Sequence, residues 1–179
     1  MASDTATWTV AERDRLPDDG NRYEVIGGEL FVTPAPSMRH QLIVNELFML
    51  LDPFVREGRL GTVLARETEV SEGDDNVVVP DIAVYPFTRK TPPKSWADAP
   101  RPILVAEIRS SITWRRDIGP KRRLYLSLGI PEYWIVDPDQ RALTVVRPDC
   151  ADERVTGVVR WQPAGAASPF EVNLATLLR

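Results

Sequence analysis

Residues 103–109 read Ile-Leu-Val-Ala-Glu-Ile-Arg, a short apolar run with a single acid inside it. A nearly continuous apolar run of this length predicts a strand that is covered on both faces. Because side chains alternate along a strand, Ile103, Val105, Glu107 and Arg109 are expected on one face. The chain is therefore predicted to be of the α/β class, with this strand inside a mixed sheet flanked by helices.

The sequence after this strand predicts a helix and a second buried strand. Asp117 is placed to cap a helix that runs to about Leu128, and Pro120 is tolerated within its first turn. Residues 133–136, Tyr-Trp-Ile-Val, then predict another buried strand, in which Trp134 belongs to the core. Further segments are expected as edge strands at 142–147 and 156–161, and as a short amphipathic tail at 170–178.

The sequence before the strand predicts a hairpin, a long helix and two more strands. The expected elements are a short helix near 9–12, strands 22–25 and 29–32 joined at Gly27-Gly28, a helix over 39–56 capped by Ser37, and strands 62–70 and 76–85. The two glycines supply the positive φ angles that a tight hairpin needs. Pro53 is expected to kink or end the long helix early.

The composition is that of a globular protein. A length of 179 residues suits one core, so we expect a single domain over 1–179, with residues 1–7 disordered. The single cysteine, Cys150, excludes an internal disulfide framework, and with the lone His40 it cannot form a structural zinc site. No run approaches the roughly 20 apolar residues that span a bilayer. The chain is therefore expected to be soluble and cytoplasmic.

Two acids lie inside apolar strands, where a carboxylate is costly to bury unless a cation pairs with it. A salt bridge to a neighbouring arginine explains Glu107 equally well when it is taken alone. Asp81 interrupts a second apolar run, 77–84, directly after Pro80, and alone the Pro-Asp pair would indicate a turn. Together the two acids indicate a site for a hard divalent cation such as Mg²⁺, which prefers oxygen ligands.

Lys121 is predicted on the first turn of the helix that follows the Glu107 strand, which places its ammonium near the two acids. In phosphodiester hydrolysis a lysine beside the metal can position or activate water and offset negative charge. A solvated lysine within a basic run is the ordinary alternative. On a chain of net charge −4, that run is also the best candidate for contacts to backbone phosphates; it comprises Arg115, Arg116, Lys121, Arg122 and Arg123.

Four further side chains are candidates for supporting this site. Glu24 and Glu29 flank the hairpin as outer acids, although carboxylates there are usually solvated. His40 is a candidate to contact phosphate, to donate to Glu29 or to cap the long helix. Tyr125 shares a helix face with Lys121 and can steer it, although packing in the core is its more common role.

The order and spacing of these motifs resemble a known family. They are Val79-Pro80-Asp81, Glu107 in its apolar strand, Asp-Ile-Gly-Pro-Lys-Arg-Arg-Leu-Tyr at 117–125, and Gly-Ile-Pro-Glu-Tyr-Trp-Ile-Val-Asp at 129–137. An opening Tyr-Glu-Val-Ile-Gly-Gly-Glu-Leu at 23–30, followed by Pro36-Ser37 and His40, adds to them. This series is similar to the Uma-type endonucleases of the PD-(D/E)XK superfamily, over roughly residues 8–178.

The resemblance implies a restriction-endonuclease-like core and a nuclease that depends on Mg²⁺, with Mn²⁺ as a substitute. The family's acids fall on Asp81 and Glu107, and its lysine, displaced from strand to helix, falls on Lys121. The backbone carbonyl of Ile108 is expected to complete the metal site. The implied partners are nucleic acid, DNA in the first place, and a second copy of the chain in a homodimer.

Two departures from the family's pattern leave other functions open. Arg109 stands where the wider superfamily keeps lysine; arginine cannot act as a base and can only stabilise phosphate charge. Ser-Ser-Ile-Thr at 110–113 replaces the family's Ser-Pro-Ser-Thr. This change and the acidic net charge favour a decayed nuclease that only binds nucleic acid. A third alternative is a structural protein whose apolar C-terminal segment makes a dimer face.

Overall fold

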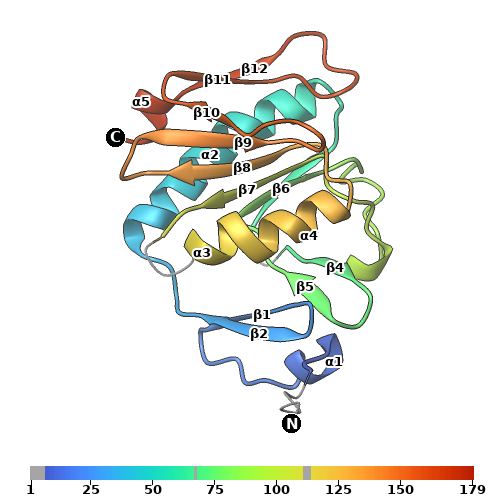
Figure 1. Cartoon of the computed structure of the whole chain (residues 1–179). Coiled ribbons are helices and arrows are strands. Elements are labelled where there is room, and N and C mark those ends of the chain that lie inside the picture. The colour runs from blue at the N-terminus through green and yellow to red at the C-terminus, as the bar shows by residue number, and fades with distance from the viewer. Residues whose placement is uncertain (1–6, 67, 111–113) are drawn as a thin grey trace.

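The computed structural model describes residues 7–66, 68–110 and 114–179, which form an α/β fold of three sheets with flanking helices (Figure 1). The strands are β1 (Arg22–Ile26), β2 (Glu29–Thr33), β3 (Thr62–Ala65), β4 (Val70–Glu72), β5 (Asn76–Val78), β6 (Ile82–Tyr85), β7 (Leu104–Ile108), β8 (Tyr133–Asp137), β9 (Ala142–Val146), β10 (Glu153–Val155), β11 (Val158–Trp161) and β12 (Phe170–Asn173). The helices are α1 (Val10–Arg13), α2 (Met38–Glu57), η1 (Trp96–Asp98), α3 (Trp114–Arg116), η2 (Asp117–Lys121), α4 (Arg122–Ser127) and α5 (Leu174–Leu177).

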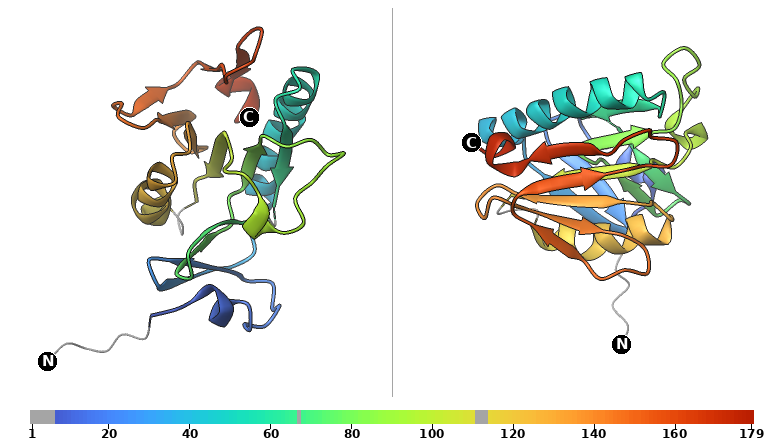
Figure 2. Two further views of the ribbon diagram at one scale, coloured as in Figure 1. Left: turned by 90° about the vertical axis from the view of Figure 1, so that its right-hand side faces the viewer. Right: turned by 90° about the horizontal axis from the view of Figure 1, so that it is seen from above.

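The central sheet has the strand order β10-β9-β8-β7-β6-β3 and is mixed, as predicted. β7 pairs parallel with β8 and antiparallel with β6. All five residues of β7 are buried, because α2 packs on one face of the sheet and α4 on the other (Figure 2). The prediction of a strand covered on both faces is thus confirmed, and Trp134 on β8 is fully buried in the core.

A second sheet, in the order β2-β1-β5-β4, lies at the N-terminal end of the molecule (Figure 1). Its β1–β2 hairpin turns at Gly27 and Gly28, whose φ angles of 59° and 76° confirm the predicted tight turn. This sheet is continuous in sequence with the central one, because β5 leads directly into β6 through residues 79–81.

Two predicted strands were wrong in extent, because each divides between the two sheets. The segment 76–85 breaks at Pro80, which cannot donate a ladder hydrogen bond, and yields β5 and β6. The segment 62–70 yields β3 and β4, and Arg66 after β3 has a φ of 60° that a strand does not allow. Both breaks occur where the chain passes from one sheet to the other.

α2 is capped as predicted, since the Ser37 side chain accepts a hydrogen bond from the His40 backbone N–H. Pro53 does not end this helix, which continues to Glu57. The predicted start of the next helix was wrong, because Asp117 lies inside a helical segment that includes α3 and not at its cap. Pro120 lacks an N–H and obstructs the carbonyl one turn earlier, and the helix widens there into the π-helical turn η2.

The C-terminal segment belongs to the core. Its apolar residues Leu174, Leu177 and Leu178 are buried together with α2 and the central sheet. They are therefore not available as the dimer face of the third alternative. The strand predicted over 156–161 forms β11, which pairs with β12, and the tail forms β12 and α5. The strand predicted over 142–147 forms β9, but its predicted edge position was wrong, because the unpredicted strand β10 pairs beyond it.

Two predictions fall mostly on residues outside the described ranges: the disorder of residues 1–7, of which only Thr7 is described, and the changed loop at 110–113, of which only Ser110 is described. Among the helices of the described residues, none has the length and apolar character needed to cross a membrane.

Candidate active site

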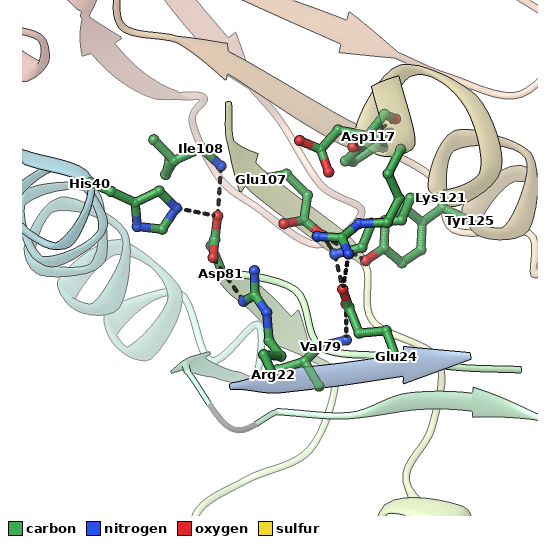
Figure 3. Close-up of polar contacts among 12 residues, drawn as sticks. Arg22, Glu24, His40, Val79, Asp81, Glu107, Ile108, Asp117, Lys121 and Tyr125 are labelled. Carbon is green, nitrogen blue, oxygen red and sulfur yellow. Dashed lines mark hydrogen bonds and ion pairs between the residues drawn. The ribbon is translucent and has the colours of Figure 1, made fainter. Parts of the chain in front are cut away.

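The register of β6 and β7 brings the two predicted acids together. Asp81 directly precedes β6, whose first residue Ile82 pairs with Ala106, and Glu107 follows Ala106 on β7. Their side chains contact different helices: Asp81 contacts His40 on α2, whereas Glu107 contacts Lys121 on η2. Asp81 is 4% exposed and Glu107 is 2% exposed, so two carboxylates are buried at one end of this strand pair (Figure 3).

Asp81 accepts hydrogen bonds from three different elements. Oδ2 lies 2.9 Å from Nε2 of His40 on α2 and 2.8 Å from the backbone N of Ile108 on β7. Oδ1 lies 3.2 Å from Arg22 on β1. His40 therefore contacts the first acid, and it is Ser37, not His40, that caps α2.

Glu107 is held by the helix that follows β7, as the position of Lys121 in the sequence predicted. Its Oε1 lies 2.6 Å from Nζ of Lys121 and accepts a hydrogen bond of 3.0 Å from the hydroxyl of Tyr125 (Figure 3). The Lys121 side chain is fully buried, so the alternative of a solvated lysine is wrong. Tyr125 belongs to the core and also contacts the acid.

Glu24 on β1 completes this cluster, and sequence reasoning underestimated it. A carboxylate beside a hairpin is usually solvated, yet Glu24 is fully buried. Its Oε1 lies 2.8 Å from Nζ of Lys121 and accepts a hydrogen bond from the Val79 N–H, and its Oε2 lies 3.1 Å from Arg116. The local pattern carries no signal for this role, because alternation that places Glu24 on the opposite face from the apolar Val25 is typical of a solvated position.

The ionisation of these groups follows from burial and from the neighbouring charges. Burial favours the neutral form of Asp81, but the hydrogen bond from His40 and the charge of Arg22 outweigh it and lower the pKa of Asp81. Burial likewise opposes the charge of Lys121, but Glu107 and Glu24 outweigh it and raise the pKa of Lys121. Burial raises the pKa of Glu107 to about 8.

A cavity of about 950 Å³ opens beside Asp81. Asp81, Ile108 and His40 line it, together with Arg22 and Arg109. Within the described part of the chain, Glu107 and Lys121 do not line it, so they lie behind Asp81 as seen from the cavity. A ligand in this space would approach the pair of acids from the Asp81 side.

Comparison with known proteins places this arrangement in a family. The Uma2 family, described as "Putative restriction endonuclease", matches residues 10–174. The chain belongs to the Uma2 family. A crystal structure of a "putative nuclease belonging to DUF820" from Anabaena variabilis ATCC 29413 is similar to it, with a TM-score of 0.78, 23% identity, and coverage of 95% of this chain and 97% of that one. No curated protein matched the sequence.

This structural similarity shows that the Uma2 chain has the restriction-endonuclease-like fold that the sequence predicted. Membership in the family supports a nuclease acting on nucleic acid. The expected fold and family are thereby confirmed, whereas the roles of individual residues are not addressed by these comparisons.

The donor set of this Uma2 site fits a hard cation only in part. Within the described ranges, no group of three or more His, Cys, Asp or Glu side chains is arranged to hold a metal ion. Asp81 and Glu107 offer carboxylate oxygens, which Mg²⁺ prefers and which it combines with water and substrate oxygens. Two carboxylates therefore supply part of a set of oxygen ligands, and the Ile108 carbonyl as a further ligand stays a prediction.

The remaining predicted residues lie away from the buried cluster or serve a different part of it. Glu29 is exposed on β2, and Arg109 pairs with Asp137 at the rim of the cavity. Arg116 is only 7% exposed and faces Glu24, which removes it from the predicted solvent-exposed basic surface. The other basic residues of that run lie nearer the solvent: Arg115, Arg122 and Arg123.

Proposed function

We propose that this chain is a metal-dependent nuclease that hydrolyses phosphodiester bonds of DNA. The observation that carries the proposal is the burial of Asp81 and Glu107 at neighbouring ends of β6 and β7, with a buried lysine beside Glu107 and an open cavity beside Asp81. Burying three acids, Asp81, Glu107 and Glu24, with the cations Lys121 and Arg116 is costly for stability, so a functional role explains the cluster better than a structural one does.

Asp81, Glu107 and the Ile108 carbonyl would hold Mg²⁺, with Mn²⁺ as a substitute. When bound there, the cation supplies Lewis acidity to the phosphate and activates water for the attack on phosphorus. The lowered pKa of Asp81 keeps this carboxylate ionised and ready to bind a cation at neutral pH.

Lys121 would act as a fixed positive charge and not as a base. Glu107 and Glu24, at 2.6 and 2.8 Å from Nζ, raise the pKa of Lys121, so its ammonium keeps its proton, and they also fix its position. A cation held in this way offsets the negative charge that gathers on the phosphate in the transition state. Glu24 is then a positioning residue, because it orients Lys121 and also forms an ion pair with Arg116.

The direct test removes each acid. Asp81→Ala and Glu107→Ala are each expected to abolish DNA cleavage that depends on Mg²⁺ or Mn²⁺ while the protein stays folded. Glu171→Ala is the matched control, because it also removes a carboxylate, but one whose side chain is 49% exposed and pairs with Arg160 at the surface. Wild-type protein that cleaves no DNA or RNA with either metal would contradict the proposal.

A nuclease fold that binds nucleic acid without cleaving it is the second candidate. It is favoured by the hydrogen bonds of Asp81, whose carboxylate has partners in His40, Ile108 and Arg22 without any metal ion. A crystal soaked with Mn²⁺ separates the two candidates. Metal density between Asp81 and Glu107 supports the enzyme, and a site without it supports the binding protein.

We also propose that the chain acts as a homodimer. Light scattering measures the mass in solution, and a monomer at all concentrations would contradict this part of the proposal without affecting the catalytic one.

A further inference from the structure

The cavity beside Asp81 has arginines on two sides of the acid. Arg39 lies on the first turn of α2, next to His40, which contacts Asp81. Arg66 follows β3, and its backbone N–H donates to the Asp81 backbone carbonyl at 3.3 Å. Both arginines line the cavity, so two different elements bring a guanidinium group to the space beside Asp81.

These two arginines are more available to a ligand than the other charged side chains near Asp81. Arg39 pairs with Asp139 at 2.8 Å, but the two side chains are 56% and 84% exposed. An exposed pair of this kind contributes little to stability and exchanges its partner easily. Arg66 is exposed and donates to the neutral side chain of Asn45, and in the described residues no carboxylate lies within 4 Å of it.

The basic run on the helix is placed differently. Arg116 faces the interior, and Arg122 pairs with Asp152 at 2.7 Å. Within the described part of the chain, Arg115, Arg116, Arg122 and Arg123 do not line the cavity that contains Asp81. Phosphates bound to these side chains would lie outside the space from which the acids are reached.

We propose that the cleaved strand of the nucleic acid runs through the cavity beside Asp81, with Arg39 and Arg66 binding the phosphates on either side of the bond that is cut. A guanidinium group binds a phosphate through two parallel hydrogen bonds, which fixes the register of the strand as well as adding affinity. The proposal rests on the proposed nuclease function, and it locates the substrate interface of that same site in the cavity and not on the helix.

The test compares two double variants that remove the same charge. Arg39→Gln/Arg66→Gln removes both positive charges from the cavity, and Arg115→Gln/Arg123→Gln removes two exposed positive charges from the helix. Binding of labelled single-stranded and duplex DNA is measured by fluorescence anisotropy in EDTA, over salt concentrations from about 50 to 200 mM. All four substituted residues are exposed, so the folding of the variants is checked by denaturant unfolding.

The cavity variant is expected to bind at least about tenfold more weakly, and the slope of log affinity against log salt is expected to fall by about two. The helix variant is expected to change both quantities only slightly. An Arg39→Lys/Arg66→Lys variant keeps both charges and should retain the slope. Equal losses in both glutamine variants, a loss confined to the helix variant, or no DNA binding by the wild type would overturn the proposal.

Cleavage with Mg²⁺ is measured separately, so that the two proposals fail in different ways. A chain that binds through the cavity arginines but cleaves nothing contradicts the nuclease and supports the interface. A chain that cleaves DNA while the helix arginines carry its binding contradicts the interface and supports the nuclease.

Discussion

Glu107 lies in a strand whose neighbouring side chains are apolar, and its burial is tolerated because a later helix supplies polar partners. Lys121 provides a charge and Tyr125 a hydroxyl, both to the same oxygen. Burial of an unpaired carboxylate would cost far more than these contacts return in net stability. At the scale of the residue, the burial of Glu107 therefore depends on polar partners that lie on one face of a single helical segment.

Tyr125→Phe tests one of these partners. The change removes the hydroxyl that donates to Glu107 but keeps the ring, whose centroid lies 4.9 Å from that of Tyr133. The free energy of unfolding is expected to fall by about 1–2 kcal/mol, because a buried charged acceptor loses a donor. Denaturant unfolding measures it. Tyr23→Phe is the control, since its hydroxyl bonds to Asp19 at the surface, and its effect should stay within about 0.5 kcal/mol.

The pH dependence of metal binding follows from the same residue. Since the pKa of Glu107 is raised to about 8, the carboxylate form becomes more abundant as the pH rises from 6 to 8. A carboxylate ligand must lose its proton to bind a metal, so the Mg²⁺ affinity should rise by up to about tenfold per pH unit and level off above pH 8. Titration calorimetry at several pH values measures this. An affinity that does not change over this range would contradict it.

At the scale of the element, the π-helical turn η2 sets where Lys121 points. A regular α-helix would place the side chains after Pro120 one step further around the axis. The turn lets α3 and α4 remain one helical segment while Arg116 and Lys121 both face Glu24. The sequence predicted that Lys121 lies near the acids, but for a different reason, namely a helix that begins at Asp117.

Pro120→Ala tests this element. Alanine restores the missing N–H and allows a regular helix, so Lys121 is expected to move away from Glu107. Cleavage activity should fall by about tenfold or more, which corresponds to an increase of about 1.4 kcal/mol in the activation free energy of cleavage. The free energy of unfolding is expected to stay equal or to rise. Pro53→Ala in α2 is the control, because it removes a helix proline away from the cluster. Full activity in the Pro120 variant would contradict the role of η2.

At the scale of the whole molecule, the candidate site joins the two larger sheets. Glu24 and Arg22 come from the N-terminal sheet, Asp81 from the link between the sheets, and Glu107 from the central one. The C-terminal segment closes the opposite side of the core, where Leu174 and Leu177 pack with α2. The site and the core therefore depend on segments distributed along the chain from β1 to α5.

Leu174→Ala tests the role of the C-terminal segment. Leu174 is fully buried, so the loss of its side chain should lower the free energy of unfolding by about 2–5 kcal/mol. Leu42→Ala is the matched control, since Leu42 on α2 is 62% exposed and its effect should stay within about 0.5 kcal/mol. Denaturant unfolding measures the change in stability, and light scattering measures the mass of the protein in solution. A change of mass without a loss of stability would revive the dimer-face alternative.

Local patterns in the sequence determined which elements form and which residues are chemically unusual. The apolar run around Glu107 predicted a doubly covered strand, and two acids in apolar strands predicted a pair, because alternation and desolvation are properties of neighbouring residues. Only the tertiary structure decided which charges meet. Glu24 is 97 residues from Lys121 in sequence, and its burial depends on how the hairpin packs against the helix. Contacts between such distant segments depend on the packing of the whole chain, which no local pattern records.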